Sequence, residues 1–457
     1  MEEGCIYCGA KDDLSKSDII PDALTNAKII NSNVCRIEHN NRFSDLFENE
    51  VISKFALITN ELDIKSSKGK TYAAYDANFL IGDTEYSTKI SSETDLFKSN
   101  KKMRSVDGKI LLGAIDEIKK IKMANSTNIS EVDVNKIEIE KRVSIDLSIY
   151  FSSAMFRLAA KIAFEWYCVK NTIKTKQNEF LSVIEFITTG IGHNIVSFVG
   201  NPAVYLAFKQ MVGLGSHALL TYVALDNSVN VIVNLFGIAI YNVRLCENTT
   251  ECCKNNVLFQ ELTLDAQRVE FVDTDLVSFQ QHLMNSFVNN NNGSRINIMV
   301  PKDMTDTTLK YKFDYINNYE IFQKDLKLII EPTEETVSLL LSNIQTILQE
   351  SPVTIRGLKR FVKEHKKSFE EGLRLNPKGT NKKAIFMFYM LFVIGRSDGQ
   401  IKNLKDLNSV LKSKFSDSTI NLNDELNIKL NKELFDSEKS VDWIVNGAKA
   451  VAEWDYE

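Results

Sequence analysis

The sequence predicts an α+β protein with a small zinc-bound N-terminal unit, a central α+β domain with an antiparallel sheet, and a helical C-terminal module. Three observations lead to this fold class. Two ligand pairs, Cys5 with Cys8 and Cys35 with His39, frame a short polar segment at the N-terminus. Helical periodicity followed by β-branched runs occupies the middle of the chain. Beyond Pro332 the apolar spacing stays helical almost to the end.

Changes in these patterns divide the 457 residues into four segments. A chain of this length is too long for a single ordinary hydrophobic core. Residues 1–65 form the zinc-bound unit, and residues 66–142 form a β-rich extension and linker. Residues 143–330 form the central α+β domain. Residues 331–457 form the helical module.

The overall composition is that of a globular protein, with 44% hydrophobic and 25% charged residues. The formal net charge of -5 gives no overall positive field for nucleic acid, although a local basic groove remains compatible with it. The sequence contains no GxxxxGK[ST] loop, GxGxxG turn or GxSxG elbow. Nucleotide hydrolysis and serine-hydrolase chemistry are therefore not supported.

The N-terminus, MEEGCIYCG, lacks the basic and apolar regions of a secretory signal, so we expect a cytoplasmic protein. The longest apolar run, residues 384–395, is shorter than the roughly 20 residues that span a bilayer. We expect a buried helix there and no membrane contact. Seven cysteines, an odd number, favour free thiols and one metal site over a disulfide framework.

Apolar spacing predicts a helix over residues 43–58 with Ser44 or Asp45 as its N-cap. Short strands are expected between residues 65 and 104. In the central domain, helices are expected over residues 148–171 and over 180–191, the second one stopped by glycine. The alternating runs of residues 217–245 are separated by Asp226-Asn227-Ser228, which predicts a β-hairpin.

The N-terminal ligand pairs have the spacing of a zinc site. Cys5-x2-Cys8 places two thiolates on a tight turn, and Gly9 after them permits a left-handed conformation. Cys35-x3-His39 supplies two further ligands, and a closed Cys3His set is structural because it leaves no position for water. The alternative is that these are ordinary buried cysteines.

The order CIYCG, SDIIPDAL and VCRIEHNNRFSDLFE resembles the HNH endonuclease family, in the branch with zinc-binding cysteine pairs around a ββα-metal core. The resemblance covers the chain from Cys5 to about Ile64. A looser similarity to the region that follows the nuclease unit in this branch includes RLAAKIAFEWY, GSHALLTYV and VIVNLFGIAIYNV.

This resemblance implies a metal-dependent endonuclease that hydrolyses phosphodiester bonds, with DNA favoured over RNA. By position, Asp18 stands where the family has its catalytic histidine, Asn40 is the asparagine after the second knuckle, and Glu48 is the metal-side residue on the helix. Asp18 and Glu48 are then expected to hold Mg2+ or Mn2+, with structural Zn2+ in the knuckles. Restriction or anti-phage defence in bacteria is the implied setting, with a homo-oligomer or a defence-system protein as partner.

Aspartate in place of histidine leaves two further interpretations open. An unperturbed aspartate is a weak base at neutral pH but a good ligand for a hard cation. In one interpretation catalysis is lost, and the chain is a zinc-dependent nucleic-acid-binding or scaffold protein. In the other, Asp18 caps the turn at Ile19-Ile20-Pro21, a role that is compatible with metal binding.

Three other groups of polar residues were candidates for binding. Arg157 and Lys161, one helical turn apart, either contact phosphate or solvate the face of a core helix. His193 and His217 lie near glycines, where a structural role competes with a second metal site. A basic segment of the C-terminal module either contacts nucleic-acid phosphates or forms a solvated face, and its candidate residues are Arg356, Lys359, Arg360 and Lys363.

Overall fold

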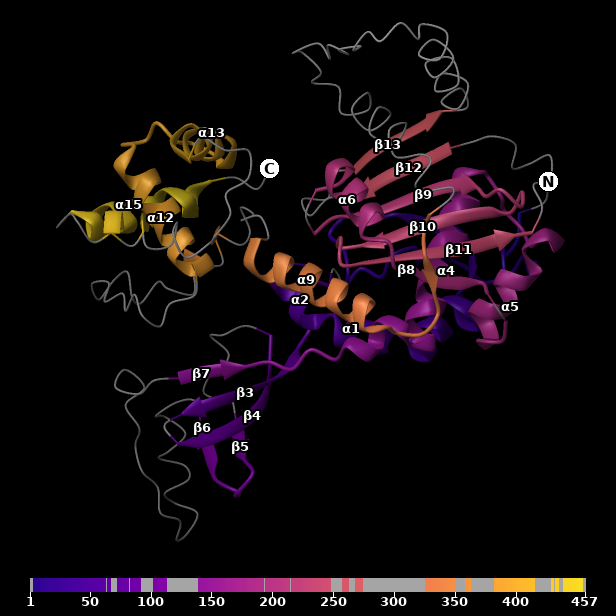
Figure 1. Ribbon diagram of the computed structural model, residues 1–457, viewed down its shortest axis with the longest axis horizontal. Helices are drawn as coiled ribbons and strands as arrows, with labels where there is room; N and C mark the ends of the chain where they lie inside the picture. Colours follow the sequence, from indigo (N-terminus) through magenta and orange to yellow (C-terminus); the bar gives the residue numbers. More distant parts are fainter. Residues whose placement is uncertain are drawn as a thin grey trace, which may run out of the picture. The chain divides into compact units, whose positions relative to one another are not determined.

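The structure is a computed structural model of the protein (Figure 1), which describes part of the chain. It comprises residues 3–62, 64–66, 72–81, 83–91, 102–112, 139–192, 194–213, 215–247, 257–262, 268–273, 325–350, 358–359, 361–362, 382–415, 429–430, 432–434 and 439–454. The chain separates into two compact units. Unit 1 contains residues 1–59, 64–75 and 143–344, and unit 2 contains residues 60–63, 76–142 and 345–457.

The N-terminal part of unit 1 is a β-hairpin followed by a helix. Strand β1 (Leu14–Asp18) pairs antiparallel with β2 (Ile30–Cys35), with a bulge between Ser15 and Ser17. The chain then turns helical at Arg36 and stays so in short pieces, which are η1 (Arg36–Asn41), η2 (Ser44–Glu48), α1 (Asn49–Lys54) and α2 (Ala56–Glu61). The two first pieces are π-helical.

The expected helix over residues 43–58 is present, but its expected N-cap is wrong. Ser44 lies inside helical backbone, and its hydroxyl donates to Glu48 Oε2 at 3.0 Å instead of capping the helix start. The helix begins earlier because Cys35, in extended conformation, leads directly into the turn that carries His39.

The centre of unit 1 is a seven-stranded antiparallel sheet, which confirms the predicted sheet type. Its order is β13-β12-β9-β10-β11-β8-β14. The predicted hairpin joins β9 to β10, and Asn227 at its turn has a φ of 63° while the Asp226 carboxylate accepts from the backbone of Ser228. The strands are β8 (Val196–Val199), β9 (His217–Val223), β10 (Val229–Leu235), β11 (Ala239–Cys246), β12 (Val257–Leu262), β13 (Arg268–Asp273) and β14 (Leu328–Ile329).

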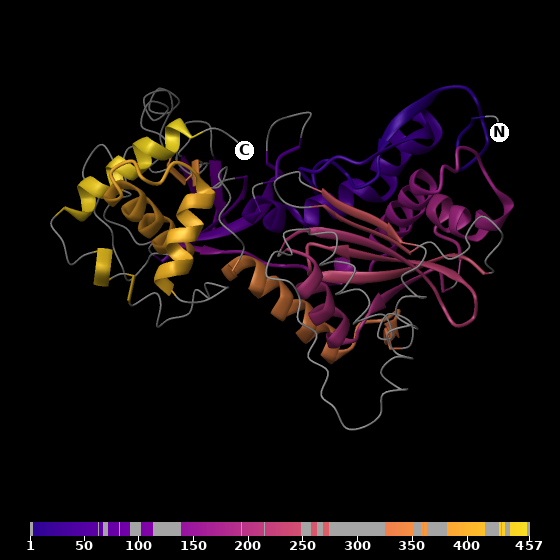
Figure 2. The same cartoon turned by 90° about the horizontal axis from the view of Figure 1, so that it is seen from above.

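Helix α4 (Ser153–Lys170) lies between this sheet and the N-terminal hairpin unit. Its Trp166 indole donates to Gln260 Oε1 on β12, whereas the neighbouring Glu165 faces the N-terminal unit. Figure 2 shows the indigo N-terminal segment on the same side of the sheet as α4 and α5 (Leu181–Thr189). Because α4 is covered on both sides, nearly all of its residues are buried, including two charged ones.

Unit 1 contains further helices besides α4. Helix α5 ends at Gly190, whose φ of 78° gives the expected glycine stop. Short 3-10 turns, η5 (Leu147–Phe151) and η6 (Asn178–Phe180), precede α4 and α5. Helix α6 (Pro202–Met211) follows β8. Helix α9 (Glu334–Glu350) follows β14, and its residues from 345 onward belong to unit 2.

Unit 2 contains a five-stranded antiparallel sheet of order β6-β5-β4-β3-β7, of which β3, β4 and most of β5 lie between residues 65 and 104, where short strands are expected, whereas β6 and β7 lie beyond it. One face of the β3 strand is buried and the other is more exposed. The strands are β3 (Tyr75–Ile81), β4 (Thr84–Ile90), β5 (Lys102–Ser105), β6 (Ile110–Leu112) and β7 (Ile139–Arg142).

The helices of unit 2 form a separate apolar core. Helix α12 (Lys382–Arg396) contains the long apolar run, and its buried residues confirm that the run is a core helix. It packs closely against α15 (Ser440–Glu453), because Gly395 and Gly447 let the two backbones approach. Helix α13 (Leu404–Phe415) adds Leu407 and Leu411 to this core. Within the described ranges, no helix combines the length and apolar content that a bilayer span requires.

Candidate metal centre and buried charge cluster

The four predicted zinc ligands come together in one group. The donor atoms of Cys5, Cys8, Cys35 and His39 all lie within 4.8 Å of one another. The Cys5 Sγ atom is 3.6 Å from His39 Nδ1, and the Cys8 Sγ atom is 3.5 Å from Cys35 Sγ. Each of these two short distances joins a residue of the first pair to a residue of the second.

These distances fit a tetrahedral zinc ion. With Zn–S bonds of about 2.3 Å and Zn–N bonds of about 2.0 Å, the edges of the tetrahedron are roughly 3.5–3.8 Å long. The Cys35 N–H also donates to Cys5 Sγ at 3.4 Å, which suits a thiolate. Burial lowers the pKa of His39 and so favours the neutral ring that binds metal. The four residues thus lie close enough together to hold one metal ion, which is consistent with structural zinc.

The loop between the first two ligands fastens the metal centre to α4. Tyr7 stacks on the His39 ring at 5.0 Å and meets Phe43 and Phe164 edge to face. Its hydroxyl donates to Glu165 Oε1 at 2.9 Å. Gly9, with a φ of 80°, closes the turn by donating to the Cys5 carbonyl, as the knuckle spacing predicts.

A buried lysine lies where the N-terminal unit meets α4. The Lys161 side chain is only 1% exposed, and its Nζ atom is 3.0 Å from Glu48 Oε1 and 3.8 Å from Glu165 Oε2. It also donates to the backbone carbonyls of Asp18 and Ile19. Four oxygen atoms from three chain segments therefore surround one ammonium group.

Burial and the neighbouring charges shift the pKa values of the ionisable groups in this cluster. Burial opposes the charge of Lys161, but the carboxylates of Glu165, Glu48 and Asp18 together outweigh burial and raise the pKa of Lys161. Burial also raises the pKa of Glu165 to about 7, against the opposing effects of Lys161 and of hydrogen bonds from Ser17 and Tyr7. Lys161 is thus charged at neutral pH, and Glu165 takes up a proton near neutral pH.

Two of the proposed catalytic residues, Glu48 and Asp18, lie around Lys161, and the third, Asn40, is held by β1. Glu48 is buried and bound to Lys161 and Ser44, and Asp18 at the end of β1 is half-buried. The charge of Asp18 acts on Lys161. Asn40 donates through its side chain to Ser15 Oγ and the Lys16 carbonyl, both at 3.1 Å, and so ties the helix start to β1.

Both expectations are wrong for Lys161, whereas Arg157 is half-buried. Lys161 is neither solvated nor open to phosphate, since the N-terminal unit covers it. Arg157 donates to the carbonyls of Ile187 and Thr188 at the end of α5. Sequence reasoning also missed Glu165. The available signal was a lysine and a glutamate four residues apart inside an otherwise apolar helix.

The remaining candidates are two histidines and the basic segment of the C-terminal module. His217 is buried, with Nε2 2.8 Å from the Leu24 carbonyl, which confirms a structural histidine. His193 lies outside the described residues. In the basic segment, Lys359 donates to the Trp454 carbonyl. The other three predicted contacts, Arg356, Arg360 and Lys363, lie outside the described residues.

Comparison with protein-family models, with curated proteins and with solved structures finds no match to this chain.

Proposed function

We propose that this chain is a zinc-dependent scaffold protein, in which the HNH-like N-terminal unit serves as a structural module and does not cleave nucleic acid. The observation that carries this proposal is the Lys161 ammonium, 3.0 Å from Glu48 Oε1. The position beside the proposed metal-side carboxylate already holds a positive charge that belongs to the chain itself.

Burial supports the same interpretation. A nuclease site needs an open position where metal, water and phosphodiester meet. Glu48 is 8% exposed, and Lys161, which lies on α4, is covered by the N-terminal unit. A divalent ion would have to displace a buried, paired ammonium group, and a substrate would have to reach a closed interface.

In this role, zinc acts on folding. When bound, the ion holds Cys5, Cys8, Cys35 and His39 in one place, and it thereby fixes the loop that carries Tyr7. Tyr7, Ser17 and Asn31 then make hydrogen bonds to Glu165, two of them to its side chain and one to its carbonyl. The metal centre thus stabilises the interface between the hairpin unit and the central domain.

A metal-dependent endonuclease is the second candidate. It is favoured by the position of Asp18 and Glu48 around one cation, since the Asp18 carbonyl and the Glu48 carboxylate both contact Lys161 Nζ, and carboxylate and carbonyl oxygens are ligands for Mg2+ or Mn2+. DNA as substrate, and a role in bacterial restriction or anti-phage defence, belong to this candidate.

One assay separates the two candidates. The intact, zinc-loaded chain is incubated with supercoiled plasmid, single-stranded DNA and RNA in Mg2+ or Mn2+, beside the variants Asp18→Asn and Glu48→Gln. The scaffold proposal expects no cleavage above the metal-only background. Cleavage by the parent that both substitutions abolish would refute it and establish the endonuclease. A gel-shift measurement on the same substrates tests nucleic-acid binding without cleavage.

A further inference from the structure

One zinc ligand differs from the other three in its exposure. Cys8 is exposed, whereas Cys5, Cys35 and His39 are buried. The cysteines Cys168 and Cys246 are buried as well, so that Cys8 is the one exposed thiol within the described ranges. A solute that reacts with sulfur therefore meets Cys8 first.

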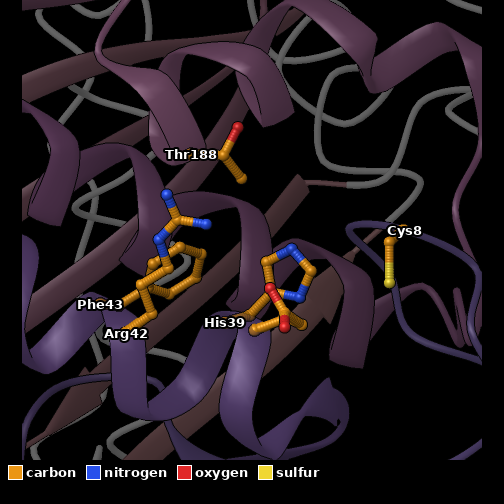
Figure 3. Close-up of a pocket in the computed structure, with 6 residues that line it drawn as sticks. Cys8, His39, Arg42, Phe43 and Thr188 are labelled. Atoms are coloured by element: carbon orange, nitrogen blue, oxygen red, sulfur yellow. The ribbon is translucent and has the colours of Figure 1, made fainter.

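A small cavity opens beside this sulfur. Its volume is about 230 Å³, several times the roughly 30 Å³ that one water molecule occupies in the liquid. Figure 3 shows His39, Arg42 and Phe43 along one helical stretch, with Thr188 on α5 and Cys8 on the separate knuckle loop. The cavity thus gives a small polar solute room next to the exposed zinc ligand, and its wall contains both the Arg42 guanidinium and the Glu38 carboxylate.

The second sulfur that a disulfide would need is already adjacent. Cys35 Sγ lies 3.5 Å from Cys8 Sγ, and a disulfide bond is about 2.05 Å long, so the two atoms need to approach by only about 1.5 Å. Cys35 is buried and out of reach of a solute in bulk water. The pair thus consists of one exposed, attacking sulfur and one covered, resolving sulfur.

We propose that Cys8 and Cys35 form a redox-sensitive pair through which hydrogen peroxide expels the zinc ion. The Cys8 thiolate attacks one peroxide oxygen, the O–O bond breaks, and hydroxide leaves, so that Cys8 becomes a sulfenic acid. The Cys35 thiolate then attacks Cys8 Sγ, the S–S bond forms, the S–O bond breaks, and a second hydroxide leaves. Peroxide gains two electrons, and each sulfur gives up one.

Loss of these two ligands has a consequence beyond the metal centre. Cys5 and His39 alone leave the tetrahedral set half empty, and zinc affinity falls with it. The disulfide still ties Cys8 to β2, but Cys5 and His39 are no longer joined through the metal, and the Tyr7 ring, which stacks on His39 and whose hydroxyl donates to Glu165 on α4, loses this support. Oxidation therefore loosens the interface between the hairpin unit and the central domain. This inference depends on the zinc centre, and it holds whether or not the chain cleaves nucleic acid.

The test uses the purified, zinc-loaded full chain and hydrogen peroxide. Released zinc is followed with a coloured chelator, and disulfides are mapped by mass spectrometry without reduction. We expect one equivalent of zinc to appear for each Cys8–Cys35 disulfide, and thiol reductant with added zinc to restore the metal. Cys168→Ala, which removes a buried cysteine that binds no metal, should release zinc at the parental rate.

Cys35→Ala provides an independent measurement, because it leaves Cys8 without its resolving partner. In this variant peroxide should leave Cys8 as a sulfenic acid, which dimedone captures. Three results would overturn the proposal: zinc retained after the peroxide is consumed, zinc released without a Cys8–Cys35 disulfide, or a first disulfide that contains Cys5. If Cys35→Ala fails to fold, disulfide mapping in the parent still decides among these outcomes.

Discussion

Substitution of Lys161 by methionine removes the positive charge from the buried cluster and keeps most of the side-chain volume. The ion pair with Glu48 spans 3.0 Å, for which Coulomb's law with an effective dielectric constant of 20 gives about 5 kcal/mol of attraction. Loss of one partner of a buried pair costs about 3–5 kcal/mol, because the other charge stays buried without compensation. We expect the opening free energy of α4 to fall by this amount.

Two further variants separate the contribution of the Lys161–Glu48 ion pair from the contributions of the groups around it. Glu48→Gln should cost less than Lys161→Met, because Lys161 keeps Glu165 at 3.8 Å and the carbonyls of Asp18 and Ile19. The double variant Lys161→Met/Glu48→Met should recover most of the loss, since an apolar pair of similar volume removes both desolvated charges. Lys54→Ala is the matched control, because its pair with Asp146 is equally short at 2.9 Å but about half exposed.

Hydrogen exchange of α4 peptides in the intact chain, with zinc in excess, measures these changes region by region. The Lys54 control should change the opening free energy by less than about 1 kcal/mol. If Lys161→Met costs no more than this control, or if the double variant costs the sum of the single ones, the buried ion pair does not stabilise the interface and the reasoning fails.

Three further predictions concern other parts of the chain. The pKa of Glu165 in the folded chain is about 7, above its ordinary value of 4.5. The contribution of this carboxyl to the free energy of unfolding therefore falls as the pH rises from about 4.5 to about 7. Glu165→Gln should therefore gain stability relative to the parent from pH 5 to pH 8, by up to about 3 kcal/mol, in denaturant titrations; a flat difference would contradict the buried carboxyl. Zinc removal by a chelator should raise hydrogen exchange in residues 30–41 and in α4, and unchanged exchange there would contradict a structural ion. Gly447→Ala places a Cβ 1.9 Å from the Leu391 carbonyl and should destabilise unit 2 by about 1–3 kcal/mol in thermal unfolding, whereas exposed Asn446→Ala should not.

Local chemistry made several features predictable from the sequence. The ligand spacings at Cys5, Cys8, Cys35 and His39 predict a metal centre because thiolates and imidazole have few other reasons to recur in this way. The hairpin turn at Asp226 and the glycine stop at Gly190 depend on backbone preferences of a few neighbouring residues, and both are present.

The sequence misled where a residue's environment comes from distant segments. The start of the first helix depends on the turn that carries His39, which propensity at Ser44 does not report. Arg157 and Lys161 looked like surface cations because charged residues on helices are usually solvated. Only the packing of the hairpin unit on α4 shows that one of them is buried.

By itself, the sequence determined the grouping of the four metal-ligand candidates, the α+β class and single features such as the hairpin at Asp226, because each follows from short-range spacing and residue type. The tertiary structure alone decided that Lys161 lies beside Glu48 and Asp18, the latter 143 positions away in the chain. A charge is buried or solvated according to what packs over it, and packing is set by the whole fold. For this reason the sequence pattern alone favours an endonuclease, whereas the buried Lys161 beside Glu48 supports the proposed scaffold.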